Sequence, residues 1–163
     1  MKPYVIVIWV FTKGQKVLLL PAKQKKAKKY GQNLYQPIEG WQRRGESDLG
    51  TIVRLIEEEL GEELARQFSR QYYYNPNLPK FAEKEFSFRN DIEMATRLHF
   101  FWGITAQQLS LITRKDIEFI GMEDLTRIKQ QGTPNDNIIL FKDDYKVLTE
   151  KILNPKMVLA TKW

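Results

Sequence analysis

The chain has 163 residues, which is long enough to bury a hydrophobic core, and we expect a single domain over residues 1–163. Its content of 42% hydrophobic and 28% charged residues is typical of a globular protein, and no apolar run approaches the roughly 20 residues that span a bilayer. It has no cysteine and one histidine, His99, which excludes disulfides and argues against a zinc site. Any metal would be held by oxygen ligands, which suits Mg²⁺ or Mn²⁺.

The formal net charge of +6 favours attraction to anionic molecules, including nucleotides and nucleic acid. Basic residues are dense in PAKQKKAKKYGQ, which contains Lys23, Lys25, Lys26, Lys28 and Lys29. A solvated loop is the simplest interpretation. The functional alternatives are a phosphate-attracting rim beside a site or a contact with RNA, although aromatic residues that stack on bases are sparse there.

The first half of the chain predicts three strands and a helix. Residues 4–11 and 17–20 are rich in β-branched and aromatic side chains, and residues 34–38 form a short extended segment. One lysine precedes the first apolar stretch and no small-residue cleavage site follows it, which argues against a signal peptide, so we expect a cytoplasmic protein. The helix begins at Ser47 or Asp48, and its apolar residues are spaced for packing on a sheet: Leu49, Ile52, Val53, Ile56 and Leu60.

Gly61 marks the end of this helix or its last turn, and residues 61–74 continue or restart it. The second half of the chain then predicts strands and helices in the order strand, strand, strand, helix, helix: 81–88, 95–104, 117–120, 122–128 and 138–153. The first two of these strands are joined around Arg89-Asn90-Asp91, and the segment GTPNDN is a loop. The resulting order, β-β-β-α-β-β-β-α with a small additional helix, predicts an α/β fold.

The segment GWQRRGESDLGTIVRLIEEELG, from Gly40 to Gly61, carries the functional signal. Five residues separate Gly40 from Glu46 and seven separate Glu46 from Arg54. The residues that follow Arg54 at the expected positions are Ile56, Glu58, Glu59 and Gly61. This register resembles the signature of the Nudix hydrolases. It departs from that signature at Leu55, where the family has a glutamate, and at Glu62, where the family has an aliphatic residue.

The resemblance implies a Nudix-type α/β/α sandwich with a mixed central sheet. It also implies Mg²⁺- or Mn²⁺-dependent cleavage of the pyrophosphate link in a nucleoside diphosphate joined to another group. The metal ligands would be Glu58, Glu59 and the carbonyl of Gly40. Arg54 would pair with Glu46 and hold the loop against the helix, so Glu46 and Arg54 join the two glutamates as catalytic residues. The partner would be a nucleotide-type small molecule, on whose base Trp41 is placed to stack.

These residue types suit the chemistry, because divalent ions neutralise the phosphate oxygens and activate the attacking water. At about 100° per residue, the helix places Leu55 on the flank between Glu58 and Glu59, so we expect a leucine in the middle of the acidic site. A carboxylate from elsewhere could compensate: Glu39, Glu62, Glu118 or Asp116. The alternative is a non-catalytic Nudix module that binds a nucleotide, RNA or a protein partner.

Overall fold

The computed structural model describes residues 4–14, 16–23, 33–74, 82–89, 92–130 and 138–152. The chain divides into two compact units, Met1–Gln15 with Pro37–Lys115 and Lys16–Gln36 with Asp116–Trp163. Whether they act as the single domain expected from the sequence stays a prediction. No helix among the described residues is long and apolar enough to cross a membrane.

The first unit is built on a mixed sheet. β1 (Tyr4–Thr12) lies at its centre, where it pairs in parallel with β6 (Ile92–Ile104) and antiparallel with β4 (Ile38–Trp41). β5 (Ala82–Arg89) pairs antiparallel with β6. Residues 6–11 of β1 are all buried, because neighbours cover both faces of this strand. The strands predicted at residues 4–11, 81–88 and 95–104 are therefore confirmed in outline.

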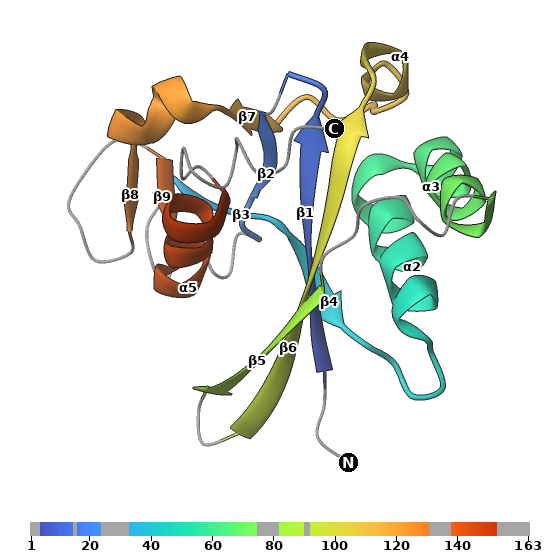
Figure 1. Cartoon of the computed structure of the whole chain (residues 1–163), viewed down its shortest axis with the longest axis horizontal. Coiled ribbons are helices and arrows are strands. Elements are labelled where there is room, and N and C mark those ends of the chain that lie inside the picture. The colour runs from blue at the N-terminus through green and yellow to red at the C-terminus, as the bar shows by residue number, and fades with distance from the viewer. Residues whose placement is uncertain are drawn as a thin grey trace. The chain divides into compact units, whose positions relative to one another are not determined.

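Two helices pack side by side in the same unit, α2 (Asp48–Leu60) and α3 (Glu62–Tyr74) (Figure 1). Ser47 caps α2, since its hydroxyl accepts a hydrogen bond from the backbone N–H of Gly50. α2 ends at Gly61, whose φ of +111° no longer continues the helix, and α3 is a new helix. A short helix that the sequence did not predict, α4 (Ala106–Leu109), follows β6. It begins with a capping box, in which Thr105 is the N-cap residue.

The second unit contains a sheet in the order β7-β2-β3-β9-β8. β2 (Val17–Pro21) pairs antiparallel with β7 (Glu118–Ile120) and with β3 (Leu34–Gln36). β9 (Ile138–Leu140) pairs in parallel with β3 and with β8 (Ile128–Gln130). The remaining elements are helical: the 3₁₀ helix η1 (Met122–Arg127), α5 (Lys142–Lys146) and the π-helix η2 (Val147–Ile152).

Three expectations need correction. The helix predicted over residues 138–153 is wrong for Ile138–Leu140, a buried strand, and the chain becomes helical only at Lys142. Residues 34–38 are not one segment, because Pro37 has no N–H to donate and separates β3 from β4. β8 was not predicted at all. The expected turn at residues 90–91 and the loop GTPNDN lie outside the described residues.

Replacing Gly61 with alanine should destabilise the fold by about 1–3 kcal/mol, because the positive φ at the end of α2 is strained for any residue with a Cβ. Urea unfolding followed by circular dichroism measures the change. Gly14→Ala is the control, since Gly14 lies in an exposed turn, has no positive φ, and would place its Cβ 3.6 Å from Thr12 Oγ1, an ordinary contact. Equal effects of the two substitutions would contradict the assignment.

Candidate active site

The loop between β4 and α2 is tied to the helix by Glu46 and Arg54. Arg54 Nε donates to Glu46 Oε2 at 2.8 Å and Arg54 Nη2 donates to Glu46 Oε1 at 2.9 Å. The same Nη2 donates to the carbonyl of Trp41 at 2.8 Å. The two side chains are only 19% and 20% exposed, and a bidentate pair of this kind is stronger than an ordinary surface ion pair. The structure thus forms the Glu46–Arg54 pair that the resemblance implies.

The Glu46 carboxylate has further donors. The backbone N–H of Arg43 lies 2.8 Å and the hydroxyl of Thr51 3.3 Å from Oε1. The hydrogen bonds from Arg54, supported by the N–H of Arg43 and by the charge of Arg54, lower the pKa of Glu46 to about 2. Gln42 adds to the turn by donating to the carbonyl of Glu46 and to Asp48, at 3.0 Å each. These hydrogen bonds hold the loop against α2, and the carboxylate of Glu46 is ionised at neutral pH.

The two glutamates expected to bind metal each face an arginine. Glu58 accepts from Arg54 Nη1 at 3.3 Å and lies 3.9 Å from Arg43 Nη2, and its side chain is 48% exposed. Glu59 accepts from Arg114 Nη1 at 2.6 Å, and both of these side chains are about one quarter exposed. Arg114 belongs to the connection between α4 and β7, so this ion pair joins the helix to a segment 55 positions further along the chain.

Leu55 lies on α2 between Glu58 and Glu59, as the helical wheel places it, but its side chain is buried instead of lying exposed among their carboxylates. Its side chain is 3% exposed and packs against Gly40 of β4. The buried residues of α2 include Leu55 and Thr51 as well as Ile56, whereas Val53 is only half-buried. The buried face of the helix is therefore rotated toward β4. A Cβ at Gly40 would lie 2.5 Å from Leu55 Cδ2, which means that the leucine occupies the space beside the glycine.

The candidate replacements for the lost carboxylate have other surroundings. Glu62 starts α3 and pairs with Arg66 at 3.4 Å, so it is not an extension of α2. Glu39 is half-buried in β4, opposite Val7. Glu118 and Asp116 belong to the second unit, where burial together with these two carboxylates raises the pKa of the Tyr35 hydroxyl. Residues 24–32, which hold most of the lysine cluster, lie outside the described residues.

Comparison with solved structures decides the fold. The *Escherichia coli* dihydroneopterin triphosphate pyrophosphohydrolase matches over 93% of this chain and 95% of its own, with a TM-score of 0.57 and 11% identity. The *E. coli* ORF135 protein covers 99% of this chain and 93% of its own, with a TM-score of 0.55 and 16% identity. A Nudix family hydrolase from *Clostridium perfringens* covers 92% and 95%, with a TM-score of 0.51 and 13% identity. The chain has the Nudix fold.

A fourth structure of this fold is a bifunctional NMN adenylyltransferase/ADP-ribose pyrophosphatase from *Francisella tularensis*, complexed with AMP and a manganese ion. It covers 91% of this chain and 40% of its own, with a TM-score of 0.56 and 13% identity. No protein-family model matches the sequence, and no curated protein matches it significantly. The expected α/β fold class is confirmed, and the likeness in sequence is too low to carry more than the fold.

The residues available for a divalent ion do not form a complete cage. Within the described parts of the chain, no three Asp, Glu or His side chains gather where they could hold a metal ion. The donors that the Nudix signature assigns are two carboxylates, Glu58 and Glu59, and the carbonyl of Gly40. Mg²⁺ is commonly bound by one or two carboxylates plus substrate phosphates and water. The donor set therefore fits an ion that arrives with a phosphate ligand, and does not fit one held by the protein alone.

Sequence reasoning missed Arg114. Nothing in its local pattern, SLITRKDIEF, marks it as a partner of Glu59, because an ion pair between segments 55 positions apart leaves no spacing signal. Among the tryptophans, the structure separates Trp9, which is fully buried, from Trp41, which is 49% exposed. Of these two tryptophans, Trp41 is the one that retains a surface on which a ligand could lie.

Acid should selectively remove the contribution of Glu46 to stability. Its pKa is lowered on folding, so its pairing stabilises the protein above its unfolded-state pKa and is lost as the pH falls toward about 2. We expect Glu46→Gln to lower the free energy of unfolding by about 1–3 kcal/mol near neutral pH, and by progressively less between about pH 5 and pH 2. Urea unfolding over this pH range tests it. Glu57→Gln, on an exposed position of α2, is the control, and a pH-independent difference for Glu46→Gln would contradict the prediction.

Gly40→Ala should destabilise the protein by about 1–3 kcal/mol, because the new methyl group would overlap Leu55. In a Leu55→Ala background the same substitution should cost much less, since the obstructing methyl groups are gone. A double-mutant cycle measured by urea unfolding isolates this coupling. Additive effects of the two substitutions would show that Leu55 does not fill the space beside Gly40.

Proposed function

We propose that the protein is a Nudix-type hydrolase that cleaves the pyrophosphate link of a nucleoside diphosphate joined to another group, such as a nucleoside triphosphate or a dinucleoside polyphosphate. In this reaction the oxygen of water forms a bond to one phosphorus and the bridging P–O bond breaks. The leaving phosphate keeps the electron pair, and the proton of the water passes to solvent or a nearby base. Proteins with this fold include a pyrophosphohydrolase of a triphosphate and a pyrophosphatase of ADP-ribose.

The observation that supports the proposal most directly is the bond network of Arg54. It joins the loop carbonyl of Trp41, the loop carboxylate of Glu46 and the helix carboxylate of Glu58 through a single guanidinium group. Loop and helix are thereby held together at the position where the Nudix signature puts its phosphate chemistry. Glu46 and Arg54 serve as positioning residues in this proposal, and Glu58 and Glu59 face the substrate.

Mg²⁺ or Mn²⁺ would be bound by Glu58, Glu59 and the carbonyl of Gly40, and it would neutralise the phosphate oxygens and lower the pKa of the attacking water. Arg114 holds Glu59 in the described structure and adds a positive charge beside it. In the proposed complex this guanidinium turns toward the substrate phosphate, since Arg binds phosphate with the same fork geometry that it uses for carboxylate. The chain's own residues then supply the carboxylates of Glu58 and Glu59 and the guanidinium group of Arg114 around the scissile link.

The packing of Leu55 favours a second candidate function, a non-catalytic module that binds a nucleotide, RNA or protein partner. The position that the family uses for a third carboxylate is buried and apolar, and the two remaining acids already have arginine partners. Such a site is electrostatically satisfied without a metal. Binding would then depend on the arginines, and the glutamates would serve to orient them.

One assay separates the two functions. Purified protein is incubated with nucleoside triphosphates, dinucleoside polyphosphates and nucleotide sugars in the presence of Mg²⁺ or Mn²⁺, and the products are resolved by chromatography. The hydrolase predicts cleavage of at least one class and a loss of about 10²-fold or more in kcat for Glu59→Gln. If the wild type cleaves nothing, and Glu59→Gln leaves the affinity for the ligand unchanged, the hydrolase is excluded and the binding module remains.

Restoring the missing carboxylate should make the thermal stability of the protein depend on a divalent metal. Leu55→Glu places a charge in a buried position and should lower the melting temperature in EDTA. If the site accepts a metal beside Gly40, Mn²⁺ should raise this melting temperature, whereas it should leave that of Leu55→Gln unchanged. Differential scanning fluorimetry measures both. An equal response of the two variants to Mn²⁺ would contradict the placement of the metal next to this residue.

A further inference from the structure

Trp41 is the large hydrophobic side chain that the described surface leaves exposed, at 49% of its area. Its backbone is nevertheless fixed. It is the last residue of β4, paired with Val5 of β1, and its carbonyl accepts the hydrogen bond from Arg54 Nη2. A rigid, exposed aromatic ring offers binding area without much loss of conformational entropy when a ligand arrives.

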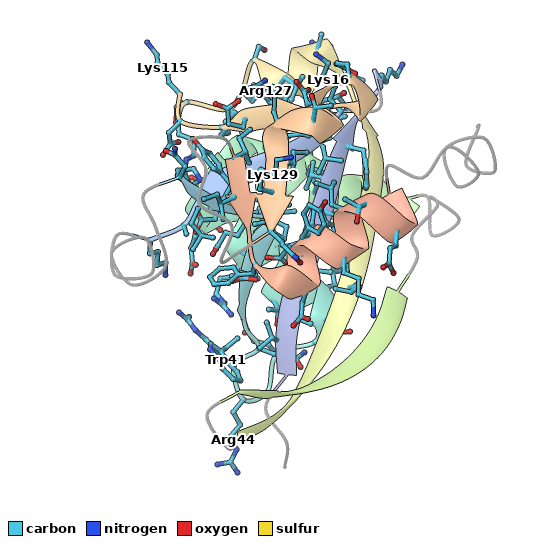
Figure 2. The ribbon with its side chains drawn as sticks, turned by 90° about the vertical axis from the view of Figure 1, so that its left-hand side faces the viewer. Lys16, Trp41, Arg44, Lys115, Arg127 and Lys129 are labelled. Carbon is cyan, nitrogen blue, oxygen red and sulfur yellow. The ribbon has the colours of Figure 1, made fainter. Side chains whose placement is uncertain are left out.

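Two arginines follow this ring within the same loop. Arg43 is two residues away, with a side chain 67% exposed, and Arg44 follows it at the turn. Figure 2 shows Trp41 and Arg44 projecting outward from the same loop. The turn itself is held by reciprocal contacts: the N–H of Arg43 donates to Glu46 Oε1, and the N–H of Glu46 donates to the carbonyl of Arg43 at 3.1 Å. An aromatic face flanked by guanidinium groups is the combination that binds a base together with its phosphates.

This loop also reaches the acidic site. Trp41 directly follows Gly40, and the guanidinium of Arg43 lies 3.9 Å from the carboxylate of Glu58. A phosphate group bound by Arg43 would therefore lie next to Glu58. The base of the same ligand would then reach the ring of Trp41, which directly precedes this short loop.

The single exposed ring also argues for a small ligand. A protein partner needs a contiguous apolar area of several hundred Å², and among the described residues Trp41 has no exposed large apolar neighbour. A single-stranded nucleic acid is usually held by several aromatic rings in succession. One ring beside two arginines matches one base with its phosphates.

We infer that Trp41 is the platform on which the base of a mononucleotide ligand stacks, with Arg43 binding its phosphates. This inference rests on the proposed function, because it uses the same phosphate site. It adds to that proposal the side chain that binds the base, and it makes this contact a large part of the affinity for the ligand.

The test compares two probes that share one phosphate bridge. α,β-Methylene-ADP carries a base and cannot be cleaved at the bridge, whereas methylenediphosphonate is that bridge without the nucleoside. Calorimetric titration with Mg²⁺ present measures both. Trp41→Ala should lower the affinity for α,β-methylene-ADP by about 5- to 100-fold, the range for loss of one stacked base. The affinity for methylenediphosphonate should stay within about twofold of the wild-type value. Arg43→Ala should weaken both probes.

Trp41→Phe is the matched control, since it keeps an aromatic face and should retain most of the affinity for the nucleotide. Melting curves check that the variants are folded. The inference is overturned if Trp41→Ala weakens both probes equally or neither, if the wild type binds no α,β-methylene-ADP, or if the substitution changes only self-association in sedimentation velocity. If nothing is hydrolysed but the difference between probes holds, the stacking inference stands and the proposed reaction fails. If hydrolysis occurs without that difference, the proposed reaction stands and the stacking inference fails.

Discussion

The ion pair between Glu46 and Arg54 is the interaction on which the arrangement of the site depends. A loop of six residues between a strand and a helix would ordinarily sample many conformations, and ordering each residue costs roughly 1–2 kcal/mol. Arg54 offsets this cost because its donors reach the start of the loop at Trp41, its end at Glu46, and the next turn of the helix at Glu58. The proposed phosphate site and the exposed tryptophan both owe their positions to that one guanidinium group.

Leu55 changes the energetic character of the site. Three carboxylates on adjacent turns would repel one another and would need a cation to be stable together. With a leucine packed against Gly40, the described site contains two acids, and arginines neutralise both. Both carboxylates thus have cationic partners in the protein itself, and any cation must compete with Arg54 and Arg114 for its ligands. Phosphate oxygens would assist such a cation, because they supply ligands that the protein lacks and attract the displaced arginines.

Fixed spacing along the chain made part of this site predictable. The interval from Gly40 through Glu46 to Arg54 matches the Nudix signature, and this resemblance implied the pairing of Glu46 with Arg54 before the tertiary structure was known. The burial of Leu55 could not be predicted, because the helical wheel takes the apolar average of α2 and ignores β4. Because Gly40 has no side chain, it leaves room for Leu55, which the helical wheel places on the polar flank of α2. Similarly, Ile138–Leu140 is too short an apolar run to distinguish a buried strand from the first turn of a helix.

The partner of Glu59 illustrates a deeper limit. Arg114 has no distinctive pattern in its own segment, and it pairs with Glu59 only because the fold brings the connection after α4 to the end of α2. Its effect on the local electrostatic potential has the same sign as that of the leucine. Leu55 stands where the family has a negative charge and so weakens the attraction for a cation, and Arg114, with Arg43 and Arg54, adds positive charge that attracts phosphate. In the proposed hydrolase, affinity for a nucleotide and the capacity to cleave it would therefore depend on different side chains, so that either property could be retained without the other.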